Sequence, residues 1–425
     1  MADPTSTLSS LVPPAVAATP VWSLDALRGA EPALALAIVM LLAVVVADLL
    51  QRFIRLPRAC GWMLVGALAS PLALQLIERT SLDPWKPLID LAIGMLLFEL
   101  GSRVRPRWLI DNPLFALGCI VEGLLAGIGV AAVLIALDAP VLSSFIAGAV
   151  AMSTSPAITL AVLHEARPRG QVTERLMMMT AINSALAMLT INAASVFVHA
   201  EGGDVTAVAA NAVYVVCGSF LLGAACGWAL HRLGRTLRGT GTMPVLQIAL
   251  VIFATLLAAR WTLSPLLALL VAGVMARRWL GHRLTVEPNF GSAGAILTVL
   301  LFISIGVMFT LEGVTRLWPW VLAIIAARFV AKGIAVVATA PASGLGWRQA
   351  SALTVALQPM SSLAVLLAAD TFGWPTQLPR MDAAVLQALL AATTLMQFTG
   401  PLWSLLGLRT LARETDDEES PRAAG

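Results

Sequence analysis

The stretch that decides the fold is FIAGAVAMSTSPAITLAVL, residues 145–163, an apolar run broken at its centre by Ser153-Thr154-Ser155-Pro156. A second stretch in the other half of the chain, ALTVALQPMSSLAVLLAA at 352–369, is broken in the same way by Gln358-Pro359-Met360-Ser361-Ser362. A membrane helix hides its backbone polar groups from lipid, so a break at mid-membrane persists only beside protein or a water-filled cavity. Paired breaks in the two halves of a chain indicate the binding site of a secondary transporter.

The composition places the chain in a membrane. Hydrophobic residues make up 59% of the sequence, charged residues only 12%, and the mean hydropathy is +0.87. No water-soluble core could absorb this much apolar surface. The charged residues gather between apolar runs of about 20 residues, the length that crosses a bilayer. The sequence therefore predicts an all-α polytopic membrane protein embedded in the lipid bilayer.

Hydropathy over a window of about 19 residues predicts thirteen transmembrane helices. They are expected at 32–50, 57–76, 87–102, 113–137, 141–164, 175–198, 206–230, 243–260, 262–277, 290–311, 317–339, 347–369 and 383–408. Residues 1–31 are expected to form an extramembrane lead-in, because they hold Pro13, Pro14 and Pro20 and no positively charged leader. Residues 409–425 are expected to form an acidic cytoplasmic tail, solvated from Glu414 onward.

The distribution of basic residues predicts the orientation. With the N-terminus outside, lysine and arginine are roughly three times as frequent in the loops and tail on the cytoplasmic side as on the outer side. This bias supports thirteen spans and a cytoplasmic C-terminus.

The two breaks become equivalent when the halves of the chain are paired. Residues 32–198 and 243–408 each hold six spans, joined by a linker helix within 199–242. Corresponding spans are an odd number apart, so the second set crosses the membrane in the opposite sense. Two inverted six-helix repeats would then bring the half-helices together at mid-membrane, with their ends aimed at a common point where they can bind ions.

Polar side chains lie in the neighbouring spans. The span 175–198 carries Asn183-Ser184, and the span 317–339 carries Arg328 and Lys332 on one helix face. Cations inside a membrane are costly and usually face a cavity or a partner. Two structural alternatives remain open: Asn183-Ser184 could simply hold helices together, and Lys332 could tie the two broken helices by binding their terminal carbonyl groups.

A carboxylate is expected to neutralise this cation pair, and the spans 87–102 and 113–137 carry three: Asp90, Glu99 and Glu122. The sequence favours Glu99. Asp90 and Glu122 are expected to be structural or to face water. The alternative for Glu99 is a salt bridge to Arg328 or to a nearby cytoplasmic arginine.

Five short motifs, over about 32–408, resemble those of the monovalent cation:proton antiporter superfamily in its thirteen-helix form. They are Leu56-Pro57-Arg58-Ala59-Cys60-Gly61 with Gly66 and Pro71; Leu97-Phe98-Glu99-Leu100-Gly101; Thr154-Ser155-Pro156-Ala157 with Val162-Leu163 and Glu165; Ala327-Arg328-Phe329-Val330-Ala331-Lys332; and Gly400-Pro401. Each motif is short, and the resemblance rests on their order, spacing and topology together.

The resemblance implies a secondary active transporter, a sodium or potassium:proton antiporter, in the cell inner membrane. It implies a dimer domain and a core domain, with two crossing broken helices in the core interrupted at Pro156 and Pro359. It also implies a homodimer and an elevator-type motion that carries the ion site across the membrane.

One position departs from the family pattern. The family has Asn-Asp or Asp-Asp in its sixth span, where this chain has Asn183-Ser184. A carboxylate can hold either a cation or a proton, whereas a serine hydroxyl ligates as a neutral oxygen and does not release a proton near pH 7. Carboxylate-based exchange at that position is therefore not expected.

Three functions remain open. The first is antiport of a monovalent cation and a proton, with the proton carried by Lys332 or Glu99. The candidate ligands of this atypical ion site are Thr154, Ser155, Asn183, Ser184, Gln358, Ser361 and Ser362. The second is transport of an anion or a zwitterionic solute held by Arg328 and Lys332. The third is a membrane receptor or scaffold without transport.

The sequence offers nothing for catalysis. No cysteine–histidine metal spacing, phosphate-binding glycine loop or serine–histidine pairing occurs in a suitable setting. We therefore expect no enzyme activity, no cofactor, no nucleic-acid partner and no metal beyond the transported alkali ion.

Overall fold

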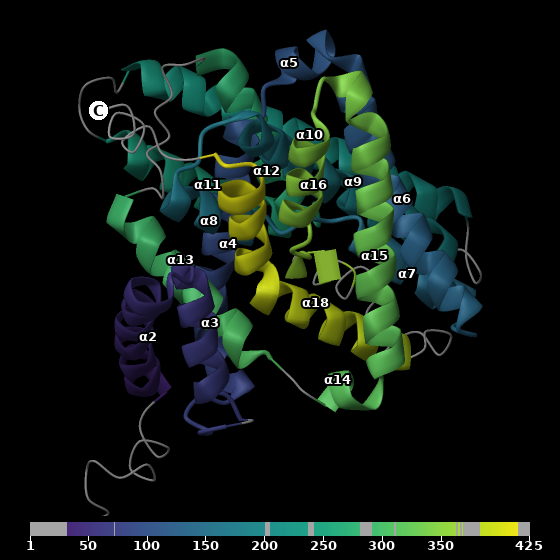
Figure 1. Ribbon diagram of the computed structural model, residues 1–425. Helices are drawn as coiled ribbons and strands as arrows, with labels where there is room; N and C mark the ends of the chain where they lie inside the picture. Colours follow the sequence, from purple (N-terminus) through teal and green to yellow (C-terminus); the bar gives the residue numbers. More distant parts are fainter. Residues whose placement is uncertain are drawn as a thin grey trace, which may run out of the picture.

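The computed structural model is almost entirely helical (Figure 1) and describes residues 32–71, 73–199, 205–236, 242–280, 291–309, 312–362, 364–365, 368 and 383–414. Its α-helices are α2 (Pro32–Ile54), α3 (Arg58–Ala69), α4 (Lys86–Arg103), α5 (Pro106–Asp111), α6 (Pro113–Ala136), α7 (Val141–Ala151), α8 (Pro156–Ala166), α9 (Gln171–His199), α10 (Val205–Thr236), α11 (Met243–Arg260), α12 (Pro265–Leu280), α13 (Gly291–Val307), α14 (Glu312–Arg316), α15 (Trp318–Thr339), α16 (Trp347–Ala356) and α18 (Ala383–Leu405). A last π-helical turn, η6, spans Leu406–Leu411. The predicted all-α membrane fold is confirmed.

The apolar helices follow the predicted spans closely. Seven described helices are long and apolar enough to cross a membrane: α2, α6, α9, α10, α11, α15 and α18. Shorter apolar helices are α3, α7 and α13. The total of thirteen spans stays a prediction. The lead-in 1–31, the tail 415–425 and most of 363–382 lie outside the described residues.

The predicted break in the span 141–164 is present. α7 ends at Ala151 and α8 begins at Pro156, with Ser155 as its N-cap. Proline has no N–H to donate and disfavours helical geometry in the residue before it, so the helix cannot run through. In the span 347–369, α16 ends at Ala356, three residues before Pro359.

The predicted end of the second span, at residue 76, is wrong: α3 ends at Ala69. The following Ser70 is extended, and Pro71 cannot continue the helical hydrogen bonds. The chain turns back instead, so that the N–H groups of Leu76 and Ile77 both bond to the Ala69 carbonyl at 3.0 Å.

Two contacts, each between a helix of the first half and a helix of the second half, are built alike. α4 packs along α12, and α13 packs along α3. At each contact a glycine on either helix faces the backbone of the other, Gly101 with Gly273 and Gly66 with Gly306. A Cβ atom at any of the four would lie 2.1–2.3 Å from a carbonyl oxygen, so only glycine permits this approach. The matching contacts fit the predicted division into 32–198 and 243–408, which stays a prediction.

A second group of helices surrounds the two broken segments. α6 lies along α15, and α9 and α18 pack beside this pair. The helices of the broken segments, α7, α8 and α16, pack against these four. In Figure 1, α6, α7 and α15 lie at the right, and α2, α3 and α13 lie together at the lower left. The broken segments are therefore enclosed by protein.

The end of the described chain is tied to this group. The carboxylate of Glu414 accepts hydrogen bonds from the Val172 and Thr173 N–H groups at 2.8 and 3.0 Å and from the Thr173 hydroxyl at 2.6 Å. It thereby caps the N-terminus of α9, where negative charge is favourable. The expectation that the tail is solvated from Glu414 onward is wrong for Glu414, which is 9% exposed.

We expect Gly273→Ala to destabilise the protein, because the new methyl group would meet the Phe98 carbonyl oxygen at 2.1 Å and α4 and α12 would have to separate. Overpacking of this kind costs about 1–3 kcal/mol. Thermal unfolding in detergent should show a lower melting temperature. Gly333→Ala is the matched control, because its methyl group would meet only the Thr354 side chain at 3.3 Å. Equal melting of the two variants would contradict the close contact.

Candidate functional site

The two broken segments meet side by side. The N–H of Ser155 donates to the Pro359 carbonyl at 2.8 Å, and Thr154 and Met360 form an isolated antiparallel bridge. The meeting point, here called the crossing, consists of residues 151–156 and 356–361. It is buried throughout, so its backbone polar groups need partners from the protein.

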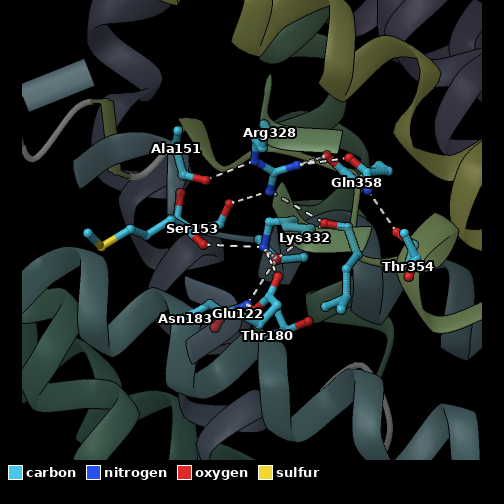
Figure 2. A network of polar contacts seen from close by, with 12 residues as sticks. Glu122, Ala151, Ser153, Thr180, Asn183, Arg328, Lys332, Thr354 and Gln358 are labelled. Carbon is cyan, nitrogen blue, oxygen red and sulfur yellow. Dashed lines mark hydrogen bonds and ion pairs between the residues drawn. The ribbon is translucent and has the colours of Figure 1, made fainter. Parts of the chain in front are cut away.

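Arg328 of α15 provides partners for both segments (Figure 2). Its guanidinium donates to the carbonyl groups of Ala151 at 2.9 Å and Ser153 at 2.8 Å, at the end of α7 and just beyond it. On the other side it donates to the carbonyl groups of Gln358 at 2.5 Å and Leu357 at 3.4 Å, beyond the end of α16. Each helix C-terminus carries roughly half a negative charge. The two ends together therefore balance the charge of this buried arginine.

Lys332 lies one turn further along α15, and its side chain reaches α6 and the first broken segment. Its ammonium forms an ion pair with the carboxylate of Glu122 on α6. Both side chains are completely buried. The ammonium also contacts the Thr154 hydroxyl at 3.2 Å and the Met152 carbonyl at 3.4 Å. Charge at the crossing is thus balanced twice, by helix ends at Arg328 and by a carboxylate at Lys332.

The expectation that Glu99 neutralises this cation pair is wrong. Glu99 is buried in the last turns of α4, where its Oε1 accepts from the Arg103 guanidinium at 2.5 Å and lies 2.6 Å from Nε2 of His164. It therefore pairs with Arg103, which is predicted to be cytoplasmic, and this is the alternative left open by the sequence. Glu122 was expected to be structural or to face water. It is 0% exposed, so the expectation that it faces water is wrong, while the structural role stays a prediction. Glu122 reaches Lys332 because α6 lies along α15.

Asn183 and Ser184 of α9 close the site from a third side. The Asn183 amide donates to the second oxygen of Glu122 at 2.6 Å and lies 3.5 Å from the Thr154 hydroxyl. Within the described part of the chain, the Asn183 Oδ1 atom is buried and has no hydrogen-bond partner. The Ser184 hydroxyl lies 2.8 Å from the Thr180 carbonyl and 3.3 Å from the Thr154 carbonyl, either of which it can bond. Asn183 and Ser184 thus both contact the break.

The remaining predicted ligands hold the break in place or line its edge. The Ser155 hydroxyl caps α8 by accepting from the Ile158 N–H at 3.4 Å. The Gln358 side chain donates to the Thr354 carbonyl at 2.8 Å and accepts from Arg328 at 3.4 Å. Ser361 is buried, and Ser362 is half-buried beside Ser155 and Pro156 in a small cavity against α4 and α13.

A larger cavity of about 350 Å³ lies at the end of α8 that is predicted to be cytoplasmic. It is lined by residues of the α2–α3 connection and of α8, α18 and η6, among them Arg55, Glu165 and Arg409. The Glu165 carboxylate accepts from the Gln51 side chain at 2.8 Å and from the Arg58 N–H at 2.9 Å. It thus links α8 to α2 and α3.

We expect Arg328→Gln to reduce folding stability sharply, since up to four backbone carbonyl groups at the crossing lose their donor. Each buried group left without a partner costs about 1–3 kcal/mol. The melting temperature and the yield of monodisperse protein should both fall, with Arg328→Lys less affected. Arg107→Gln, at an exposed arginine, should behave as wild type. A stable Arg328→Gln variant would contradict the capping role.

The comparisons with known proteins agree with this fold. The family model for the transmembrane region of sodium/hydrogen exchangers matches residues 37–404. Two structures of the sodium proton antiporter MjNhaP1 from Methanocaldococcus jannaschii have a similar fold. The structure at pH 8 gives a TM-score of 0.68 at 14% identity, over 92% of this chain and 100% of the other. The electron-microscopy structure gives 0.67 at 14% identity, over 90% and 98%.

No match to a curated protein sequence is found. The family model nevertheless covers most of the chain, from α2 to α18. The protein therefore belongs to the sodium/hydrogen exchanger family of multi-pass membrane transporters.

Proposed function

We propose that the protein exchanges a monovalent cation, sodium or potassium, for protons by elevator-type alternating access. The observation that carries this proposal is the buried ion pair of Lys332 and Glu122 at the point where two broken helices meet. Buried charges are rare in membrane segments, and they mark ion pathways and proton relays. Family membership supplies the reaction class.

The proposed ion site is atypical because it has Ser184 where the family pattern has an aspartate. Neutral oxygens of Thr154, Asn183 and Ser184 lie around the break and support a site for a desolvated alkali ion. Ser155, Gln358, Ser361 and Ser362 belong to the same proposed site as residues that shape the crossing. Lys332 is proposed to release the proton, since arginine keeps its proton in proteins.

The contacts favour a cation over an anion or a zwitterionic solute. Arg328 donates to backbone carbonyl groups of both broken segments, and Lys332 is paired with Glu122. An anion would have to displace these partners and leave buried carbonyl groups and a carboxylate without donors. No specific contact favours the receptor or scaffold function.

Alternating access is proposed to move the helices around the crossing against α2, α3 and α4. Glu165 and His164, at the end of α8, contact Gln51 and Glu99 respectively. These contacts would have to break during the motion. The cavity beside Glu165 supports access to the site from the predicted cytoplasmic side.

The proposal extends to assembly and location. We propose a homodimer in the cell inner membrane, with the N-terminus outside and the C-terminus in the cytoplasm. The basis is the charge bias of the loops and the family resemblance.

Purified protein in lipid vesicles should dissipate a preset pH gradient when sodium, potassium or lithium is added. Because Lys332 is proposed to release the proton, Lys332→Ala should lose this response. A fluorescent pH probe inside the vesicles measures the rate, and protein-free vesicles are the control. If no alkali ion produces a response from wild-type protein, the proposed function fails.

Cross-linking should stop transport if α8 moves against α2. In a variant without the four native cysteines, Gln51→Cys and Glu165→Cys place two thiols where the native side chains touch. A short bifunctional thiol reagent should abolish the flux, and its reductive cleavage should restore it. The control pair is Gly118→Cys with Thr339→Cys, which links α6 and α15 within the proposed moving unit. Full flux through the cross-linked Gln51/Glu165 pair would contradict the elevator motion.

A further inference from the structure

This chain has a serine at position 184, where the family pattern has a titratable aspartate. We propose that Glu122 of α6 is the carboxylate that binds the transported cation, and that Lys332 competes with the cation for it. This inference rests on the proposed function and assigns a residue to it. Sequence reasoning expected Glu122 to be structural or to face water.

The position of Glu122 supports this assignment. One carboxylate oxygen pairs with Lys332, and the other accepts from the Asn183 amide at 2.6 Å. Asn183 and Ser184 both contact Thr154, and Lys332 contacts the Thr154 hydroxyl as well. The carboxylate of α6 and the serine of α9 therefore belong to one cluster around Thr154. A carboxylate can serve that cluster from either helix.

A second observation points to a ligand. The Asn183 side chain is completely buried, and its Oδ1 atom has no hydrogen-bond partner in the described part of the chain. This oxygen lies beside Gly123, where an added Cβ atom would be 3.2 Å away. An orphaned buried oxygen is explained by a bound water or ion. Amide, hydroxyl and carboxylate oxygens are the ligands that hard cations prefer.

The exchange step conserves charge and atoms. Without a bound cation, the Lys332 ammonium and the Glu122 carboxylate form a neutral pair. When a cation M⁺ binds, the ion pair breaks, M⁺ coordinates the carboxylate, and the ammonium releases one proton to water and becomes an amine. One cation enters and one proton leaves, so the site stays neutral in both states.

Neutrality matters because an uncompensated charge in the membrane interior is costly. Among the residues that the structure describes, the other charged group facing the crossing is Arg328, whose charge is held by carbonyl groups of both broken segments. From α9 and the segment after α16, the facing side chains are Asn183, Ser184 and Gln358, none of which is charged. The exchange of a cation for a proton is thus confined to Lys332 and Glu122.

The alternative is that the pair only stabilises the fold. Removing one member of a buried ion pair leaves the other unpaired and is strongly destabilising. Loss of activity in one variant therefore does not distinguish the two roles. Two other measurements do distinguish them: the cation affinity of Glu122 variants, and the flux of a variant in which the carboxylate is moved to α9. Neither result follows from stability.

The test uses vesicle flux and cation-induced thermal stabilisation, with lithium, sodium and potassium as probes. Glu122→Gln should lose both the cation-dependent flux and the cation-induced rise in melting temperature. Glu122→Asp keeps the charge on a shorter side chain and should transport with a raised KM. Glu99→Gln removes another buried carboxylate, one outside the crossing, and should keep the cation-induced rise in melting temperature; it is the matched control for that measurement.

The double variant Glu122→Gln with Ser184→Asp should regain cation-dependent flux, because it returns a carboxylate to the same cluster. A folded double variant without flux contradicts the shared site. A folded Glu122→Gln variant with wild-type KM overturns the assignment. If that variant does not fold, an unchanged KM in Glu122→Asp overturns it instead. An inactive wild type defeats the proposed function, whereas an active wild type with an indifferent Glu122 defeats only this inference.

Discussion

The structure depends on one constraint: two helices end inside the membrane, and their backbone carbonyl groups need donors there. Arg328 meets this need for both ends, through the carbonyl groups of Ala151 and Ser153 on one side and Gln358 on the other. A lysine could not reach as many, because only a guanidinium presents five donors in a rigid fork. Arg328 thus holds the two broken segments together at the crossing.

The second cation is of a different kind. Lys332 has a carboxylate partner, Glu122, in an environment where neither side chain touches solvent. Such a pair gains little net stability over apolar side chains of similar size, since desolvation offsets the attraction. Its presence at the crossing is better explained by function: it is a neutral group that can exchange one proton for one cation. In the proposed ion site, Ser184 is a neutral neighbour, and the carboxylate comes from α6 in place of α9.

Much of the fold was predictable because the bilayer fixes the length of a span and penalises a break. The runs that became α2, α6, α10, α11 and α15 stand out by apolarity alone. The positions of Pro156 and Pro359 mark the two interruptions. The end of α3 was harder, because Ser70-Pro71 stops a helix within a sequence that remains apolar to Ile77. The contact of Glu414 with α9 was not predictable, since nothing in the local sequence places an acidic tail residue against a distant helix end.

The partner of Lys332 was mispredicted for a physical reason. An ion pair inside a membrane depends on which helices are neighbours, and hydropathy along the chain does not give neighbours. Two signals were nevertheless present. Glu99 stands four residues before Arg103, the spacing of a local pair on one helix. Glu122, by contrast, stands well inside an apolar helix, at a depth comparable to that of Lys332 in α15.

The most direct test of the central claim is proton release on cation binding. Purified protein in weakly buffered detergent solution is titrated with lithium, sodium or potassium while the pH and the bound cation are measured together. The account predicts about one proton released for each cation bound, because the Lys332 ammonium must become neutral when Glu122 takes the cation. Cation binding without proton release would contradict it.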